Sequence, residues 1–123
     1  MSSQRVLRPI RITAAAIAAL YAAAAWSHAH LQQQTPAADS TQAAPQEVRL
    51  DFSEPLEAAL SKIEVTDGAG KQVTANKAAV DATAPRTLRV QLGKLTPGNY
   101  TVDWNVVSTD GHRAKGSYRF TVE

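Results

Sequence analysis

The sequence predicts an all-β fold, an antiparallel sandwich or barrel of about seven short strands. Three observations predict it. Apolar and polar residues alternate with a period of two in several segments after residue 46, which is typical of strands with one buried face. Turn-forming residues separate these segments at short intervals, and no long stretch shows the periodicity of a helix. Short strands divided by turns are the pattern of sandwiches and barrels.

The strand pattern begins after a polar lead-in. Residues 32–46 are rich in Ala, Pro, Ser and Thr, which predicts an extended or loop-like segment. Val48, Leu50 and Phe52 then alternate with polar residues and predict the first strand. Residues 55–60 are too few for a long helix, so we expect a short helical turn there.

The middle of the chain predicts a hairpin, a loop and a further strand. Apolar residues alternate over 63–65, and this strand ends at the Asp-Gly turn of residues 67–70. Residues 71–74 are expected to form the returning strand of the hairpin. The polar stretch 76–86 is expected to be a loop, and alternation over 88–92 predicts the next strand.

The last third predicts two longer strands. Residues 96–99 form a Pro-Gly turn, and four apolar residues then share one face over 100–106. A polar break follows at 108–115, and residues 118–122 close the chain as a final strand. Tyr100 directly follows the turn, as in a tyrosine corner, although a core tyrosine with its hydroxyl at the surface fits the position equally.

The N-terminal segment carries the features of an export signal. Arg5, Arg8 and Arg11 precede an uncharged apolar run over residues 12–26. A charged region followed by a short apolar region is typical of a secretory signal peptide, which we assign to residues 1–27. The apolar run is shorter than the roughly 20 residues that usually cross a bilayer, so an uncleaved anchor is the less favoured alternative.

Removing the signal peptide leaves a domain at 28–123, which we expect in the periplasm or outside the cell. This domain has ten basic and eleven acidic side chains, so no basic surface favours nucleic acid.

The chain has no cysteine, which excludes disulfides, thiolate metal sites and cysteine nucleophiles. A chain of 123 residues is also too short for a Rossmann oxidoreductase or a TIM barrel.

The three histidines are unusually placed. Small residues allow signal cleavage before His28 or before His30, so the mature domain begins with histidine in either case. An N-terminal histidine can chelate a metal with its ring and its α-amine, whose pKa is only about 7.7. His112 lies in the polar break two residues after Asp110, and the two side chains can point the same way.

These donors predict a metal site. Three nitrogens from two histidines form the arrangement called a histidine brace, and nitrogen and oxygen donors in tetragonal geometry suit Cu(II). Zinc would fit the same side chains. If His28 comes first, a second binding mode uses the amine, backbone nitrogens and the ring of His30. The simpler explanation is a histidine that follows the cleavage site by chance and an ordinary Asp-Gly-His turn.

Longer motifs point to a family. Three stretches carry the resemblance: HAHLQQQTPAADS, VRLDFSEPL and TLRVQLGKLTPGNYTVDWNVVSTDGHRAKGSYRFTV. The third is the most specific, because a Pro-Gly-x-Tyr-x-Val-x-Trp run precedes Ser-x-Asp-x-His. Over residues 28–123 the sequence resembles the CopC-type periplasmic copper-binding proteins, the copper resistance protein C family. This resemblance implies a small immunoglobulin-like Greek-key sandwich or barrel.

The resemblance also implies a ligand set. By position, Cu(II) would be bound by His28, Asp110 and His112, and the register of the N-terminal motif favours His28 as the first mature residue. His30 is a second-tier candidate. So is Glu54 of the Phe-Ser-Glu motif, because the equivalent glutamate lies near copper in some members.

The sequence departs from many members of the family in one respect. Those members also bind Cu(I) through a methionine-rich loop, whereas the only methionine here is Met1. Soft Cu(I) prefers sulfur ligands, so we expect a Cu(II) site alone.

The expected function is therefore that of a monomeric periplasmic Cu(II) carrier or buffer in copper resistance or homeostasis, without enzymatic activity. The resemblance implies an inner-membrane copper transporter of the CopD type as a partner. One alternative is a histidine-brace copper oxidase or monooxygenase, although so small a domain leaves little room for a substrate-binding face. The other is a metal-free immunoglobulin-like interaction module.

Overall fold

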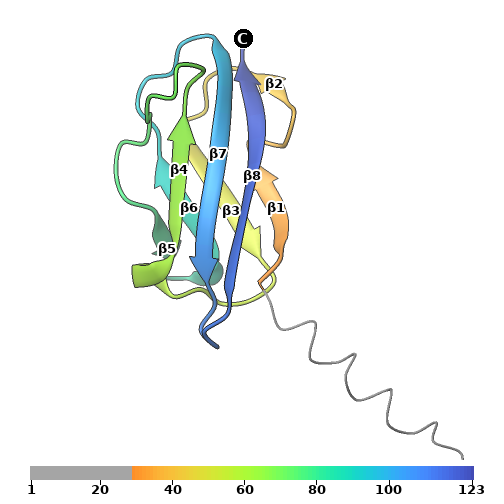
Figure 1. Cartoon of the computed structure of the whole chain (residues 1–123), viewed down its shortest axis with the longest axis vertical. Helices are drawn as coiled ribbons and strands as arrows, with labels where there is room; N and C mark the ends of the chain where they lie inside the picture. The colour runs from red at the N-terminus through yellow and green to blue at the C-terminus, as the bar shows by residue number, and fades with distance from the viewer. Residues whose placement is uncertain (1–28) are drawn as a thin grey trace, which may run out of the picture.

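The computed structural model describes residues 29–123 as two packed β-sheets (Figure 1). In spatial order the first sheet contains β1 (Leu31–Thr35), β3 (Glu47–Phe52), β6 (Ala84–Gln91) and β5 (Ala79–Asp81). The second contains β2 (Thr41–Gln42), β8 (Arg113–Val122), β7 (Gly98–Val107) and β4 (Lys62–Thr66). All pairings are antiparallel except that of β2 with β8. The predicted all-β sandwich is confirmed, and neither sheet closes into a barrel.

The core forms where the alternating residues of both sheets face each other. Every second residue of β3 is buried, and the same alternation continues in β4, β7 and β8. Burial of one apolar face is the main favourable term in folding such sheets. The largest fully buried apolar side chains are Phe52, Phe120, Leu50, Leu88, Val48, Val65, Val90, Val102 and Val106.

Tyr100 forms a tyrosine corner at the start of β7. Its hydroxyl donates to the carbonyl oxygen of Thr96 at 2.6 Å and accepts from the Thr96 amide at 3.1 Å. The ring stacks on Phe120 with centroids 5.4 Å apart. Of the two positions that the sequence allows for this side chain, the structure shows the corner.

Trp104 crosses the inner side of β8 at a glycine. Trp104 and Gly116 are opposite each other in the β7–β8 ladder, and a Cβ at position 116 would lie 2.1 Å from Cζ2 of the indole. The indole ring is 6.5 Å from the ring of Phe52 and 6.2 Å from that of Tyr118, centroid to centroid. Gly116 therefore makes room for a half-buried tryptophan at the side of the sandwich where β1 begins.

The expectation of an extended or loop-like lead-in over residues 32–46 is correct for the backbone, but it did not include the two strands that the structure shows there. β1 pairs with β3, and the two residues of β2 pair with the end of β8. Alternation of apolar and polar residues does not reveal these two strands, because their side chains are exposed or only half-buried. Long-range pairing with the sheet, rather than local pattern, makes this segment extended.

Two expectations for the middle of the chain are correct only in part. The hairpin does return after the Asp-Gly turn, because Gln72 pairs antiparallel with Thr66 and the Val73 amide donates to the Val65 carbonyl at 2.8 Å. The return is too short for a regular strand, because the segment then crosses to the other sheet, where Thr74 pairs with Leu92. The expected loop at 76–86 contains β5 and the beginning of β6, which are joined by a tight turn at Asp81.

Other boundaries lie close to the expected ones. A 3-10 turn, η2 (Ala58–Leu60), occupies the end of the expected helical turn. β8 begins at Arg113, inside the expected polar break. The sequence does not show this start, because the outward side chains of the first residues of β8 are polar.

Within the described residues no helix is long and apolar enough to span a membrane. The proposed signal peptide and the alternative anchor, both within residues 1–27, lie outside the described residues.

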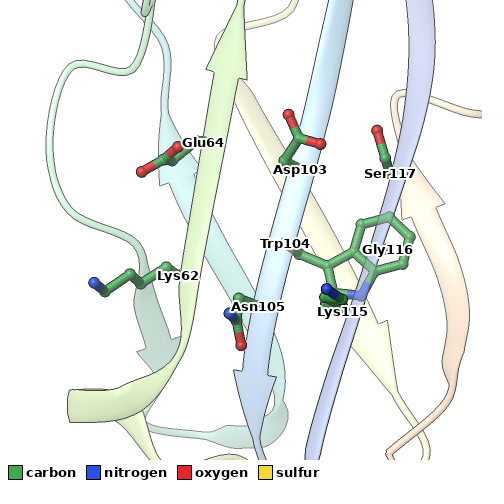
Figure 2. A pocket seen from close by; sticks show the side chains of 8 residues that line it. All are labelled: Lys62, Glu64, Asp103, Trp104, Asn105, Lys115, Gly116 and Ser117. Atoms are coloured by element: carbon green, nitrogen blue, oxygen red, sulfur yellow. The ribbon is translucent and has the colours of Figure 1, made fainter.

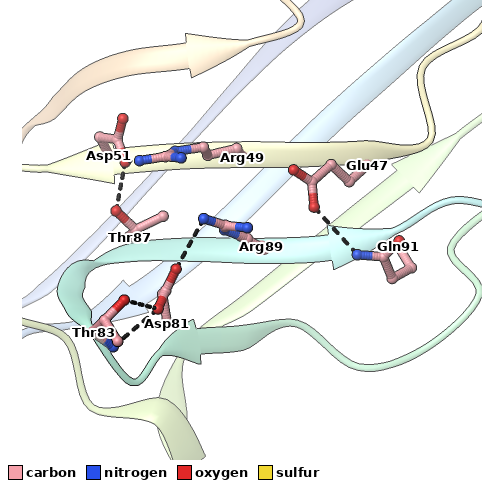
Figure 3. A network of polar contacts seen from close by, with 8 residues as sticks. All are labelled: Glu47, Arg49, Asp51, Asp81, Thr83, Thr87, Arg89 and Gln91. Carbon is pink, nitrogen blue, oxygen red and sulfur yellow. Dashed lines mark hydrogen bonds and ion pairs between the residues drawn. The ribbon is translucent and has the colours of Figure 1, made fainter.

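The outer face of the first sheet carries a polar network (Figure 3). Arg49 and Arg89 are directly opposite each other on β3 and β6. Each cation has a carboxylate partner: Arg49 Nε lies 3.3 Å from Asp51, and Arg89 lies 2.9 Å from Asp81. Hydrogen bonds from Thr83, first its backbone amide and then its hydroxyl, lower the pKa of Asp81. The opposite charges on this face are therefore paired within the sheet.

Candidate metal site

The candidate site lies at the turn that connects β7 to β8, at the lower end of the sandwich in Figure 1. The turn closes through a hydrogen bond from the Ser108 amide to the His112 carbonyl at 2.9 Å. Gly111 donates to the Ser108 carbonyl at 2.8 Å and has a φ of +88°. Glycine adopts this left-handed conformation without strain, so it places the residues on either side of it close together.

Asp110 and His112 are in direct contact on this turn. Oδ2 of Asp110 lies 3.0 Å from Nδ1 of His112, and the two side chains are 47% and 43% exposed. Oδ1 accepts a hydrogen bond from the buried hydroxyl of Ser108 and a longer one, 3.3 Å, from the His112 amide. The Ser108 hydrogen bond and then that of His112 lower the pKa of Asp110 from 3.8 to about 2. The carboxylate is therefore anionic, partly exposed and held beside an imidazole.

The described start of the chain is bonded to the end of β3. The His30 amide donates to Oγ of Ser53 at 2.8 Å, and the Ser53 amide donates to the His30 carbonyl at 2.8 Å. The His30 side chain is exposed, whereas the preceding Ala29 is buried. The chain start is thus attached to the sandwich through its backbone, and the ring of His30 is directed to the surface.

The segment of residues 53–57 also reaches the Asp110 turn. Pro55 accepts a hydrogen bond from the Thr109 amide at 3.0 Å, and Leu56 pairs with Ser108. Glu54 lies half-buried between these two attachments. The fold therefore places the chain start, Glu54 and the Asp110 turn at one end of the molecule.

The structure brings together only part of the predicted ligand set. Asp110 and His112 are in contact, but the described residues contain no group of three or more His, Cys, Asp or Glu side chains positioned to hold a metal. His30 and Glu54 lie at the same end of the sandwich, but they form no three-residue group with Asp110 and His112. His28, the first ligand that the resemblance implies, lies outside the described residues.

A hollow of about 390 Å³ lies beside the chain start. Its walls include Ala29, His30 and Trp104, together with the first residues of β8, Arg113 to Lys115. The indole of Trp104 therefore lies at the surface that the chain start borders, which makes it a candidate fluorescent reporter of events there.

A larger hollow of about 620 Å³ lies on the outer face of β4, β7 and β8 (Figure 2). Lys62, Glu64, Asp103 and Lys115 surround it, so both signs of charge are present. Figure 2 shows the Trp104 ring against β8 at Gly116 and the charged side chains spread over the sheet rather than converging. This lining contains no histidine, and its carboxylates and ammonium groups form no cluster around a single point.

The Asp110 turn supplies one imidazole and one carboxylate, which are donors that suit Cu(II) and Zn²⁺. Two donors from one turn would make an incomplete metal site, so a metal ion bound here would need a further donor from another segment. Ser53 has contacts that the sequence does not predict. The Phe-Ser-Glu motif points only to Glu54 as a donor, whereas the bonds of Ser53 to His30 depend on contacts between distant segments.

Comparison with known sequences shows where the chain is similar to other proteins. The family model described as "CopC domain" matches residues 31–123. Protein YobA of Escherichia coli K12 is 43% identical over 100 residues, which cover 80% of this chain and 81% of YobA. Copper resistance protein C of Pseudomonas syringae pv. tomato is 38% identical over 118 residues, which cover 91% and 94% of the two chains.

Another relative is much longer. Copper transport protein CutJ of Bacillus subtilis is 30% identical over 99 residues, which cover 79% of this chain but only 18% of CutJ.

Solved structures show the same sandwich. The crystal structure of CopC from Methylosinus trichosporium OB3b superimposes with a TM-score of 0.73 at 37% identity, covering 78% of this chain and 94% of that one. PcoC, described as a methionine-rich copper resistance protein from Escherichia coli, gives a TM-score of 0.69 at 35% identity, covering 79% and 100%. The matched region in sequence, residues 31–123, includes both sheets and the turn that bears Asp110 and His112.

Proposed function

Because this chain belongs to the CopC family, whose members serve copper resistance and transport, we propose that it is a periplasmic Cu(II)-binding protein that carries or buffers copper. The family membership confirms the resemblance noted in the sequence and assigns a copper-related function. The oxidation state, the ligands and the location are our proposal. The contact between Asp110 and His112, in a turn held beside the chain start, is the observation that carries it.

The first step of the proposal concerns the donors on the turn. The carboxylate of Asp110 is ionised at neutral pH, which offsets part of the charge of a divalent cation. His112 would meet the ion through Nε2, or through Nδ1 after the contact with Asp110 is replaced. Ser108 holds the carboxylate from the opposite side, so neither donor needs a large rearrangement to bind.

The second step concerns the third donor. None of the other described side chains completes a three-residue group with Asp110 and His112. The mature N-terminus expected at His28 would add an amine and an imidazole on one residue. Ala29 and His30, which follow it directly, are attached at the same end of the sandwich as the turn. We therefore propose His28, Asp110 and His112 as the ligands, with His30 and Glu54 as secondary candidates.

The third step concerns the oxidation state. PcoC is described as methionine-rich, whereas this chain has Met1 as its single methionine and no cysteine. Without thioether or thiolate donors, the proposed site favours Cu(II) over Cu(I). We propose a single Cu(II) site and no exchange of copper between sites of different oxidation state.

The fourth step concerns the destination of the copper. In CutJ, named as a copper transport protein, the region similar to this chain is 18% of a much longer polypeptide. This supports a domain that works next to a transporter. We propose delivery to an inner-membrane copper transporter of the CopD type, with this chain acting as a separate monomeric carrier without catalytic activity.

The test is a Cu(II) titration in competition with a chromophoric chelator. Protein that begins at His28 is compared with protein that carries one additional glycine before His28. The added residue preserves every side chain but moves the free amine away from the histidine. We expect the glycine to weaken Cu(II) binding by roughly 100-fold or more, because loss of even an outer partner of a metal ligand costs about 10- to 100-fold.

Equal affinities in the two proteins would contradict the proposed N-terminal ligand. Absence of tight binding in both would favour the metal-free interaction module. Quenching of the Trp104 fluorescence, measured in the same titration, reports whether the ion binds at the end of the sandwich where this side chain lines the hollow beside His30. Protein purified from the periplasm is analysed by mass spectrometry to establish its first residue.

A further inference from the structure

The segment at the end of β3 is bonded to both parts of the proposed site at once. Ser53 is joined to His30 by two hydrogen bonds of 2.8 Å, one in each direction. Both backbone polar groups of His30 are therefore engaged by a single residue. This pairing lies just beyond the β1–β3 ladder, which begins at Leu31 and Phe52.

The same segment holds the Asp110 turn two residues later. The Pro55 carbonyl accepts from the Thr109 amide at 3.0 Å, and the Glu57 amide donates to the Val107 carbonyl at 2.8 Å. The turn that carries Asp110 is thus attached to residues that directly follow Ser53. A short stretch of backbone sets the position of the chain start relative to the turn.

We infer that Ser53 is a positioning residue for Cu(II), because its hydroxyl holds the chain start where the N-terminal donors meet Asp110 and His112. This inference rests on the proposed function. A chain start that is already ordered loses less conformational entropy when its amine binds the ion. Without the hydroxyl, the His30 amide loses its acceptor, and the position of Ala29 and His30 has to be fixed when the metal binds.

The test combines Ser53→Ala with the N-terminal glycine extension. In protein that begins at His28, we expect Ser53→Ala to weaken Cu(II) binding by roughly tenfold, the order expected when one or two residues lose their order. In the glycine-extended protein we expect no further loss, because the amine no longer contributes. Ser53→Thr, which retains a hydroxyl, should bind Cu(II) nearly as tightly as the original protein.

Ser61→Ala is the matched control. The Ser61 hydroxyl also accepts a hydrogen bond from a backbone amide, that of Val107 at 3.2 Å, but it does not contact the chain start. The variant should lower stability without the N-terminus-dependent loss of copper affinity. If Ser61→Ala and Ser53→Ala weaken copper binding equally, the effect is one of general stability and the inference is wrong.

A measurement on metal-free protein provides an independent readout. Amide hydrogen exchange at His30 should be slow in the original protein and in Ser53→Thr, and faster in Ser53→Ala, because the amide loses its acceptor. Unchanged exchange would overturn the inference.

The two proposals fail in different ways. If the glycine extension weakens binding but Ser53→Ala does not, the inference fails and the proposed N-terminal ligand stands. If Ser53→Ala weakens binding equally with and without the extension, Ser53 acts on the Asp110 turn rather than on the chain start, and the inference again fails. If the extension has no effect, the N-terminal ligand itself is contradicted.

Discussion

Two turns at opposite ends of the sandwich are built around the same dipeptide, Asp-Gly (Figure 1). In the turn after β4, Oδ1 of Asp67 accepts from the amides of Ala69 and Lys71, both at 2.9 Å. In the turn after β7, the carboxylate of Asp110 accepts a longer bond from one backbone amide, that of His112 at 3.3 Å, and in addition contacts two side chains, the hydroxyl of Ser108 and the imidazole of His112.

The difference shows what converts a structural turn into a candidate metal site. The carboxylate of Asp67 acts as a cap for backbone amides, which is the usual role of aspartate in turns. The carboxylate of Asp110 has a side-chain nitrogen beside it, because a histidine follows two residues later. An aspartate in an Asp-Gly turn therefore does not by itself indicate a metal site. The donor atoms beside the aspartate determine whether a metal could bind there.

Substitution of the two aspartates should change copper affinity to very different extents. Asp110→Ala should weaken Cu(II) binding by roughly 10- to 100-fold, because the site loses its anionic donor or the partner of its imidazole. Asp67→Ala should leave the affinity unchanged and lower the free energy of unfolding by about 1 kcal/mol, because two amides lose their acceptor. Chelator competition and urea denaturation of both variants measure the two quantities.

Weaker copper binding in Asp67→Ala would contradict the expected independence of the two turns, because the two ends of the sandwich would then be coupled. Unchanged affinity in Asp110→Ala would remove the turn after β7 from the proposed site.

A smaller effect is expected from the glycines of the two turns. Gly111 and Gly70 have φ values of +88° and +81°, and a Cβ at either position would meet no atom within 4 Å. Alanine should therefore cost about 1–2 kcal/mol of stability in both turns through backbone strain alone. We expect a severalfold loss of Cu(II) affinity in Gly111→Ala only, because this turn sets the Asp110–His112 geometry. Equal copper affinity in the two variants would show that the ion itself can restore that geometry.

The smallest effect concerns Asp81, which like Asp67 caps a turn. Its pKa in the folded protein is lowered from 3.8, first by the Thr83 amide. A carboxylate whose pKa is lower in the folded protein stabilises the fold at pH values above its pKa in the unfolded chain, 3.8. This stabilisation is lost as the pH falls through the pKa of the folded protein. Between about pH 5 and pH 2, the original protein should therefore lose more stability than Asp81→Asn. Parallel urea midpoints over this range would contradict the expected role of this cap.

Local pattern predicted the central strands and the Asp110 turn well. Val48, Leu50 and Phe52 alternate strictly, and their burial follows that alternation. Asp110 and His112 were identified as a pair because two residues of turn or strand suffice to bring them together. The ligand role of these two residues and of His28 remains a prediction, and the copper-related function follows from family membership.

Local pattern failed where pairing partners were distant in sequence. β1, β2 and β5 are short and expose many of their residues, so nothing in their own composition distinguishes them from loops. Residues 71–74 begin as the expected return of the hairpin, where Gln72 pairs with Thr66, but then cross to the other sheet, where Thr74 pairs with Leu92. In each case the available backbone partner, not the side-chain pattern, decided the conformation.

Residue types and short spacings are enough to establish the all-β class, the family, the pairing of Asp110 with His112 and the lack of sulfur ligands other than Met1. The bonds of Ser53 to His30 and of Pro55 to Thr109 are seen only in the folded protein. These contacts join residues more than 20 positions apart, and the packing of two sheets creates them. They could not be predicted, because period-two alternation specifies which face of a strand is buried but not which strand lies beside it.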